Sequence, residues 1–217
     1  MYLDRTDAGR ALARRLAHYA GRPDVLVLAL PRGGVPVGYE LARELRAPLD
    51  VFLVRKLGVP WQPELAMGAV ASGGAIFIND EVVRTCGITP EQIARVLQEE
   101  SRILAERERD YRGDTPPPVL EGRIAILVDD GLATGSSMRA AIAALRPQRP
   151  ARAVVAVPVA AAATCDLLRA EVDEIVCAAT PEPFWAVGQW YADFAPVSDD
   201  EVRALLERAR SEYRAVA

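Results

Sequence analysis

Short apolar runs recur along the chain and predict the strands of a buried sheet. They cover residues 25–30, 51–54, 124–128 and 154–159, with a weaker run at 175–178. Continuous apolar runs of this kind are typical of strands that are covered on both faces.

Amphipathic segments alternate with these runs and predict helices. They cover residues 6–19, 35–45, 136–145, 160–170 and 199–214. Because strands and helices alternate, the pattern predicts an α/β fold in which helices flank a parallel sheet. In such sheets ligands bind at the carboxyl ends of the strands.

Two stretches interrupt the alternation. Residues 57–80 are rich in Gly and Pro, which indicates a hairpin or a mobile excursion. A long helix follows, opened by a capping box at residues 89–92 and running to about Arg112. Its second half is charged nearly all round, which predicts a solvated surface, with a helical dimer arm as the alternative. Within it, Glu108 and Arg112 have the spacing of a favourable helical ion pair.

The chain shows no repeat and no linker that clearly separates two domains. We therefore expect a single domain over residues 1–217. Residues 57–118 form a loop-and-helix insert, and residues 180–217 form a C-terminal hood or cap segment.

Composition narrows the class of protein. With 51% hydrophobic and 26% charged residues the chain is typical of globular proteins. A formal net charge of -4 disfavours a general nucleic-acid binder. No apolar run is long enough for a membrane span, and the start lacks the apolar centre of a signal peptide, so we expect a cytoplasmic protein.

Cysteine and histidine are too sparse to suggest a metal site. Cys86, Cys165 and Cys177 are far apart and form no C-x-x-C pair, so we expect buried, reduced thiols rather than a disulfide framework or zinc site. His18 is the only histidine, which leaves a Ser-His-Asp triad or a multi-histidine metal site without support. We expect no protein metal ligands.

The most informative segment follows the apolar run at residues 124–128. Two adjacent carboxylates, Asp129 and Asp130, end this predicted strand and can accept hydrogen bonds from a vicinal diol such as that of ribose. The small-residue turn that follows leads into a helix and exposes backbone N–H groups that can hold a phosphate. This turn consists of Ala133, Thr134, Gly135, Ser136 and Ser137.

Other nucleotide-binding motifs do not fit this segment. A Walker A loop needs Gly-Lys-Ser/Thr, and the chain's only lysine is Lys56. A G-x-G-x-x-G fingerprint is also missing here. An acidic strand end followed by an ordinary helix start is the plainer alternative.

The segment from Arg123 to Ser137 resembles the phosphoribosyl-pyrophosphate signature of the type I phosphoribosyltransferases. It has the apolar run, the two acids, then Ala-Thr-Gly and small hydroxyl residues, with Ser137 where threonine is usual. The resemblance implies that residues 129, 130 and 133–137 bind the ribose and 5-phosphate of 5-phosphoribosyl-1-pyrophosphate (PRPP).

Two further segments fit the same family. The loop at residues 30–38 resembles the family's pyrophosphate loop, in which Gly33 and Gly34 allow close backbone approach and Arg32 neutralises charge. A basic pair, Arg55 and Lys56, ends the predicted second strand and would face pyrophosphate. All the other basic residues are arginine, which suggests a chemical reason for this lysine, with a chance surface lysine as the alternative.

The resemblance implies displacement of pyrophosphate at the anomeric carbon of PRPP through an oxocarbenium-like transition state. Arg55, Lys56, Asp129 and Asp130 would be the catalytic residues, and Mg²⁺ would be held largely by substrate oxygens. Residues 57–74, with Trp61 and Glu64, are a candidate closing loop, and an ordinary surface hairpin is an equal alternative.

The acceptor stays open. Ala133 stands where 6-oxopurine members usually carry aspartate, which disfavours hypoxanthine and guanine. In contrast, Phe184 and Trp185 lie in a segment that resembles the purine-stacking region of those enzymes, although core packing of this aromatic cluster is an equal alternative.

We therefore expect a transferase of nucleotide metabolism, a pentosyl-transferring glycosyltransferase, that transfers ribose 5-phosphate from PRPP to a nitrogen nucleophile such as a nucleobase. Its partners would be these small molecules and, from family habit, a second copy in a homodimer, with no nucleic acid or membrane. The main alternative is a non-catalytic protein that senses PRPP or a nucleotide. An ATP-using diphosphokinase on a related fold is the third possibility.

Overall fold

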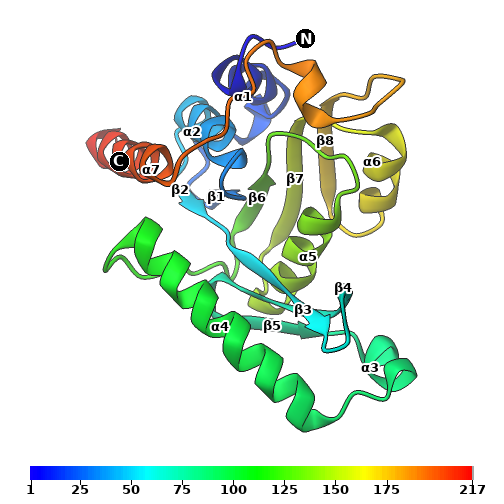
Figure 1. Ribbon diagram of the computed structural model, residues 1–217. Helices are drawn as coiled ribbons and strands as arrows, with labels where there is room; N and C mark the ends of the chain where they lie inside the picture. Colours follow the sequence, from blue (N-terminus) through cyan, green and yellow to red (C-terminus); the bar gives the residue numbers. More distant parts are fainter. Residues whose placement is uncertain (217) are drawn as a thin grey trace.

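A five-stranded parallel sheet forms the centre of the molecule in the computed structural model, which describes residues 1–216 (Figure 1). The strand order is β2-β1-β6-β7-β8. The strands are β1 (Val25–Ala29), β2 (Leu49–Val51), β6 (Ile124–Val128), β7 (Arg152–Val159) and β8 (Glu174–Ala179). The central strands are buried along nearly their whole length, as their continuous apolar runs predict.

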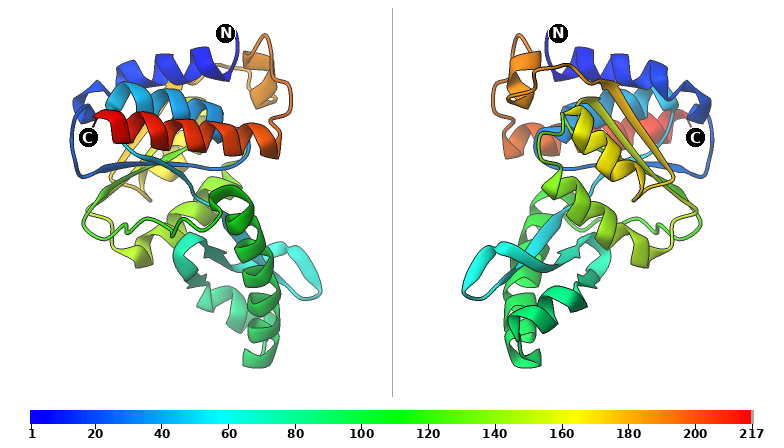
Figure 2. Two further views of the ribbon diagram at one scale, coloured as in Figure 1. Left: turned by 90° about the vertical axis from the view of Figure 1, so that its left-hand side faces the viewer. Right: turned by 90° about the vertical axis from the view of Figure 1, so that its right-hand side faces the viewer.

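Helices cover both faces of this sheet. Figure 2 shows α1 (Arg5–Arg15), α2 (Gly34–Leu45) and α7 (Asp199–Val216) lying side by side on one face. The other face carries α5 (Ser136–Leu145) and α6 (Ala162–Arg169). Successive strand residues alternate between the two layers: Val27 packs with the first group and Leu28 with the second.

The insert between β2 and β6 builds a second, antiparallel sheet of order β3-β4-β5. Its strands are β3 (Val54–Val59), β4 (Gln62–Ala71) and β5 (Ala75–Ile78), followed by α3 (Asp80–Cys86) and α4 (Pro90–Arg112). Figure 1 shows the long helix α4 running along this small sheet and back to the edge of the parallel one. Short 3-10 helices lie at Ala17–Tyr19, Ser72–Gly74, Arg146–Gln148 and Val187–Trp190.

The second predicted strand is wrong in its boundary. The parallel strand is β2, which ends at Val51, whereas Val54 already begins β3 of the antiparallel sheet. The chain turns at Phe52 and Leu53, which are buried, so the apolar run continues through the turn and hides it. Arg55 and Lys56 therefore lie near the start of β3 rather than at the end of a parallel strand.

The prediction of a solvated second half for α4 is wrong at three residues, which are buried: Leu104, Tyr111 and Arg112. Arg112 is buried, and its Nε lies 2.9 Å from Oδ1 of the buried Asp50 of β2. The same guanidinium donates to the carbonyl of Val51 at 2.7 Å and lies 2.5 Å from Glu108. This ion pair fixes the end of α4 to the edge strand of the parallel sheet.

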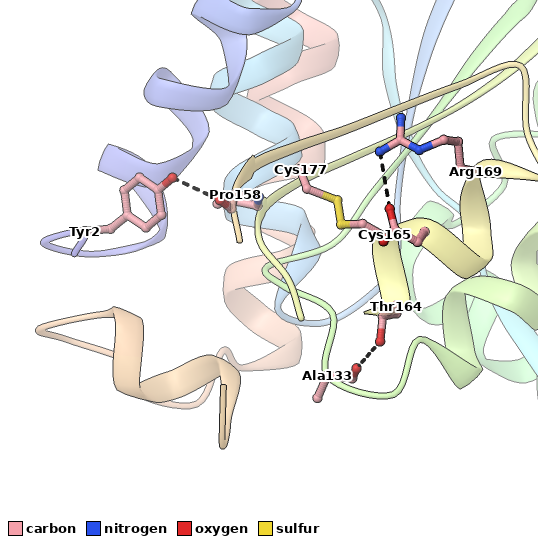
Figure 3. Close-up of a disulfide and its surroundings, with 8 residues drawn as sticks. Tyr2, Ala133, Pro158, Thr164, Cys165, Arg169 and Cys177 are labelled. Atoms are coloured by element: carbon pink, nitrogen blue, oxygen red, sulfur yellow. Dashed lines mark hydrogen bonds and ion pairs between the residues drawn. A yellow bond between two sulfur atoms is a disulfide. The ribbon is translucent and has the colours of Figure 1, made fainter. Parts of the chain in front are cut away.

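The expectation of three reduced thiols is wrong for two of them. Cys165 of α6 and Cys177 of β8 form a disulfide (Figure 3), while Cys86 is free. The separation of twelve residues hid the pairing because α6 folds back onto the neighbouring strand. Among the helices of residues 1–216, none is long and apolar enough to cross a membrane.

Candidate active site

Two loops meet at the carboxyl edge of the parallel sheet, because β1 and β6 are neighbouring parallel strands. The loop after β1 carries Gly33 and Gly34, and the loop after β6 begins with Asp129 and Asp130. A Cβ on Gly34 would lie 2.6 Å from the carbonyl oxygen of Val128, and one on Gly33 would lie 2.0 Å from Oδ2 of Asp130. A side chain at position 34 would therefore push the two backbones apart, and one at position 33 would displace the carboxylate of Asp130.

The paired carboxylates occupy an environment that disfavours their charge. Burial, followed by the neighbouring charge of Asp130, raises the pKa of Asp129 well above its ordinary value. Burial also raises the pKa of Asp130, and the guanidinium of Arg5 opposes this shift. Oδ1 of Asp129 accepts the backbone N–H of Asp130 at 2.9 Å. Perturbed carboxylates in a cleft are typical of functional sites.

Arg5 is a site residue that the sequence analysis did not identify. Its Nε donates to Oδ2 of Asp130 at 2.9 Å, and its Nη1 donates to the carbonyl of Ala195 at 2.8 Å. The guanidinium also lies 3.9 Å from the ring centroid of Phe194. One arginine from α1 thus ties the second carboxylate to the segment before α7. Its position near the N-terminus offered no motif that could have revealed it.

A cavity of about 380 Å³ opens beside Asp129. Its walls come from the loop after β1, the turn between β2 and β3, the loop after β6, the start of α5, and α4. Of the residues expected to bind ligand, Arg32, Arg55, Asp129 and Ser137 line it. Five separate chain segments therefore line this one cavity.

Lys56 does not line this cavity, although its neighbour Arg55 does. The two follow each other on β3, so their side chains point to opposite faces of the strand. Lys56 is exposed, and Arg55 pairs with Glu100 of α4 at 2.6 Å. The role of Lys56 toward pyrophosphate remains a prediction that this arrangement does not support.

The turn at residues 133–137 leads into α5 as its sequence predicts. Gly135 precedes the helix with φ 70°, in the left-handed region that favours glycine. The hydroxyl of Thr164 in α6 donates to the carbonyl of Ala133 at 2.6 Å and holds the turn from behind. Thr134, Ser136 and Ser137 are exposed at the start of this helix. Such a helix start suits a phosphate group.

The aromatic candidates lie apart from the cavity. Phe184 is half-buried and stacks on Trp190 with ring centroids 6.3 Å apart, while Trp185 is 81% exposed. Phe184 and Trp190 pack with Tyr191 and Phe194. The side chain of Phe184 is therefore part of an aromatic packing cluster, which was the alternative to base stacking. The hydroxyl of Tyr191 donates to the carbonyl of Asp130 at 2.6 Å, which ties this aromatic cluster to the carboxylate loop.

The candidate closing loop is an antiparallel hairpin of β3 and β4. Trp61 and Glu64 are exposed near its tip, and neither lines the cavity. Closure of this hairpin over a ligand stays a prediction.

Residues 1–216 contain no group of three or more His, Cys, Asp and Glu side chains arranged to hold a metal ion. Among these same residues a single carboxylate, that of Asp129, lines the cavity. This suits a Mg²⁺ ion that is held mainly by the oxygens of a bound phosphate compound.

Comparison with known proteins agrees with the fold. The family model for the phosphoribosyl transferase domain matches residues 2–194. The chain therefore belongs to the phosphoribosyltransferase family, in agreement with its type I signature and its five-stranded parallel sheet.

Two relatives are similar along nearly the whole chain. A Mycobacterium tuberculosis protein named "Putative phosphoribosyl transferase" is 46% identical over 213 residues, which is 98% of this chain and 48% of that protein. The crystal structure of a Thermus thermophilus protein, TT1426, has a TM-score of 0.86 and 42% identity, covering 96% of this chain and 99% of that one. The chain thus spans about half the length of its mycobacterial relative.

Proposed function

We propose that this protein transfers ribose 5-phosphate from PRPP to a nitrogen nucleophile and releases pyrophosphate. The observation that carries the proposal is the cavity in which Asp129, Ser137, Arg32 and Arg55 meet. An acceptor for ribose hydroxyls, a helix start suited to phosphate and a group of arginines line this one cavity. PRPP carries the matching groups, a ribose with a 5-phosphate and a pyrophosphate, so this lining supports the proposal.

The ribose diol would be held by the carboxylate pair. Asp129 faces the cavity, whereas Asp130 already accepts from Arg5, so Asp129 would take the larger share of the hydroxyl hydrogen bonds. A carboxylate accepts such bonds best when it is ionised. The negative charge of the pair would also stabilise positive charge that develops on the ribose ring during transfer.

The two phosphate ends would bind to different elements. The 5-phosphate would lie on the amides and hydroxyls of residues 133–137, at the start of α5. The pyrophosphate would face the Gly33–Gly34 backbone, Arg32 and Arg55. As the bond from C1 to the pyrophosphate oxygen breaks, its electron pair leaves with pyrophosphate and the nitrogen lone pair forms the new bond to C1. These arginines would stabilise the charge that collects on the leaving group.

Mg²⁺ would supply further positive charge to the pyrophosphate oxygens, with Asp129 as the protein group placed to approach it. The acceptor nitrogen would release its proton to solvent water as the new bond forms. We propose a nucleobase as acceptor because the family resemblance implies one, and we assign no particular base. Phe184 and Trp185, the residues expected to stack on a base, do not line the cavity.

The test is calorimetric titration with PRPP, with and without Mg²⁺, followed by a pyrophosphate-release assay over a panel of nucleobases and simple amines. Mg²⁺-dependent binding and release with one acceptor would support the transferase and identify its substrate. Binding without release by any acceptor would favour a PRPP-sensing protein instead. The absence of PRPP binding would contradict both.

A further inference from the structure

The long helix α4 forms one wall of the proposed active site. Its inner face carries Glu100, Leu104, Arg107 and Tyr111, which are spaced three or four residues apart and so share one side of the helix. Glu100 pairs with Arg55, Leu104 and Tyr111 are buried, and both Arg107 and Tyr111 line the cavity. No nucleotide-binding motif covers this helix.

Arg107 completes a group of three arginines around one hollow. Arg32 comes from the loop after β1, Arg55 from β3 and Arg107 from α4, and Asp129 is the only carboxylate among the cavity-lining residues of the part of the chain described here. Three guanidinium groups from unconnected segments are costly to bring together, because their like charges repel. A compact ligand with several negative charges offsets that cost.

A carboxylate from α7 lies close to two of these arginines. Oδ1 of Asp199 lies 3.6 Å from Nη1 of Arg107, and Oδ2 lies 3.8 Å from Nη1 of Arg32. The hydroxyl of Tyr111 donates to Oδ1 of the same carboxylate. Both distances exceed those of a good charged hydrogen bond, so Asp199 interacts only weakly with either arginine.

We infer that Arg107 is a further pyrophosphate-binding residue. The carboxylate of Asp199 competes with the bound anion for Arg32 and Arg107, and the anion displaces it. The inference rests on the proposed function and extends its pyrophosphate site to α4 and α7. It makes opposite predictions for the two residues. Removing Arg107 weakens anion binding, and neutralising Asp199 strengthens it.

The experiment measures the affinity of the whole protein for inorganic pyrophosphate with Mg²⁺, and for ribose 5-phosphate as the ligand without pyrophosphate. Arg107→Ala should weaken pyrophosphate binding by roughly tenfold or more, since a charged hydrogen bond is lost, and leave ribose 5-phosphate binding unchanged. The affinity of Arg107→Lys for pyrophosphate should lie between those of wild type and Arg107→Ala. Lysine keeps the positive charge but cannot make the bidentate hydrogen bonds of a guanidinium.

Asp199→Asn should tighten pyrophosphate binding by roughly two- to fivefold, the size of a half-exposed ion pair, while its side-chain oxygen still accepts from Tyr111. Arg102→Ala is the matched control, because Arg102 lies on α4, is exposed and pairs with Glu106 on the same helix. It should change neither affinity.

Three outcomes would overturn the inference. They are Arg107→Ala behaving like Arg102→Ala, equal losses of pyrophosphate and ribose 5-phosphate, and unchanged or weaker binding in Asp199→Asn. If wild-type protein binds pyrophosphate with these mutant effects but transfers ribose to no acceptor, the inference stands and the transferase proposal fails. If wild-type protein does not bind pyrophosphate, the inference fails, and the PRPP titration and release assay decide the transferase proposal separately.

Discussion

At the scale of single residues, Asp129 and Asp130 are adjacent in sequence but differ in their surroundings. Asp129 faces the cavity, while Asp130 is held by Arg5 and its carbonyl by Tyr191. The sequence motif predicts the same ligand-binding role for both residues. The protein holds Asp130, so we propose that Asp129 is the carboxylate that meets the ligand.

This difference predicts an order of effects on PRPP affinity. Asp129→Asn should weaken binding by about 1.5–3 kcal/mol for each charged hydrogen bond lost, and Asp130→Asn should cost less. Calorimetric titration of both variants measures the order. Asp166→Asn, whose side chain is 76% exposed on α6, is the control and should bind like wild type. A larger loss for Asp130→Asn would contradict the assignment.

The same pair predicts a dependence of stability on pH. Because burial raises the folded-state pKa of Asp129, the folded protein binds this proton more tightly than the unfolded chain does. The ionised group therefore lowers the free energy of unfolding as pH rises from the ordinary aspartate pKa of about 4 through the raised value.

Asp129→Asn should remove that cost and stabilise the fold at pH 7, on the order of 1 kcal/mol. The gain should shrink toward pH 4, where the wild-type carboxyl is protonated. Urea unfolding of both proteins across this range measures it. A gain that stays constant with pH would show that the ionised carboxylate is not its source.

At the scale of elements, α4 connects the small sheet to the parallel one. Its capping box at Thr89 and Gln92 sets the start, and the buried Arg112–Asp50 pair fixes the end. Between them, the inner face brings Arg107 and Tyr111 to the cavity. The ion pair at the C-terminal end of α4, directly after Tyr111, therefore fixes the part of the helix that lines the cavity.

Arg112→Ala should destabilise the protein by about 3–5 kcal/mol, because it leaves Asp50 buried without its partner. Arg109→Ala removes an exposed arginine from the same turn and should change the free energy of unfolding by less than about 0.5 kcal/mol. Denaturant unfolding compares the two. If Arg112→Ala lowered the free energy of unfolding as little as Arg109→Ala does, Asp50 would have another partner or be protonated in the variant.

At the scale of the whole molecule, the two sheets differ in how well they are covered. Strands β1 and β6 are buried along their entire length, whereas α3 has no buried residue and β5 is only partly covered. Few buried apolar contacts give a segment a low free energy of local opening.

Amide hydrogen exchange should therefore be fastest, among the regular elements of the insert, in α3 and β5. Their amides should exchange at least about tenfold faster than those of β6. Mass spectrometry of exchanged peptides measures this. Equal protection of α3 and β6 would mean that the insert and the parallel sheet open as one cooperative unit.

Much of the architecture was available from the sequence alone. Apolar runs predicted β6 with its observed bounds, and helical periodicity with capping residues predicted where α4 and α5 begin and end. These patterns are local, so they are readable without the fold. The glycines and acids at the ends of β1 and β6 also identified their own loops, because their chemistry is set by neighbours in the chain.

Only the tertiary structure decided which distant groups meet. It joined Arg5 to Asp130, Asp199 to Arg32 and Arg107, and Cys165 to Cys177. It also separated Arg55, at the cavity, from Lys56, and ended β2 inside an unbroken apolar run. Hydrophobic and helical periodicities record whether a residue is buried, but not against what. The partners of each charge depend on how helices and strands pack together, which no local pattern contains.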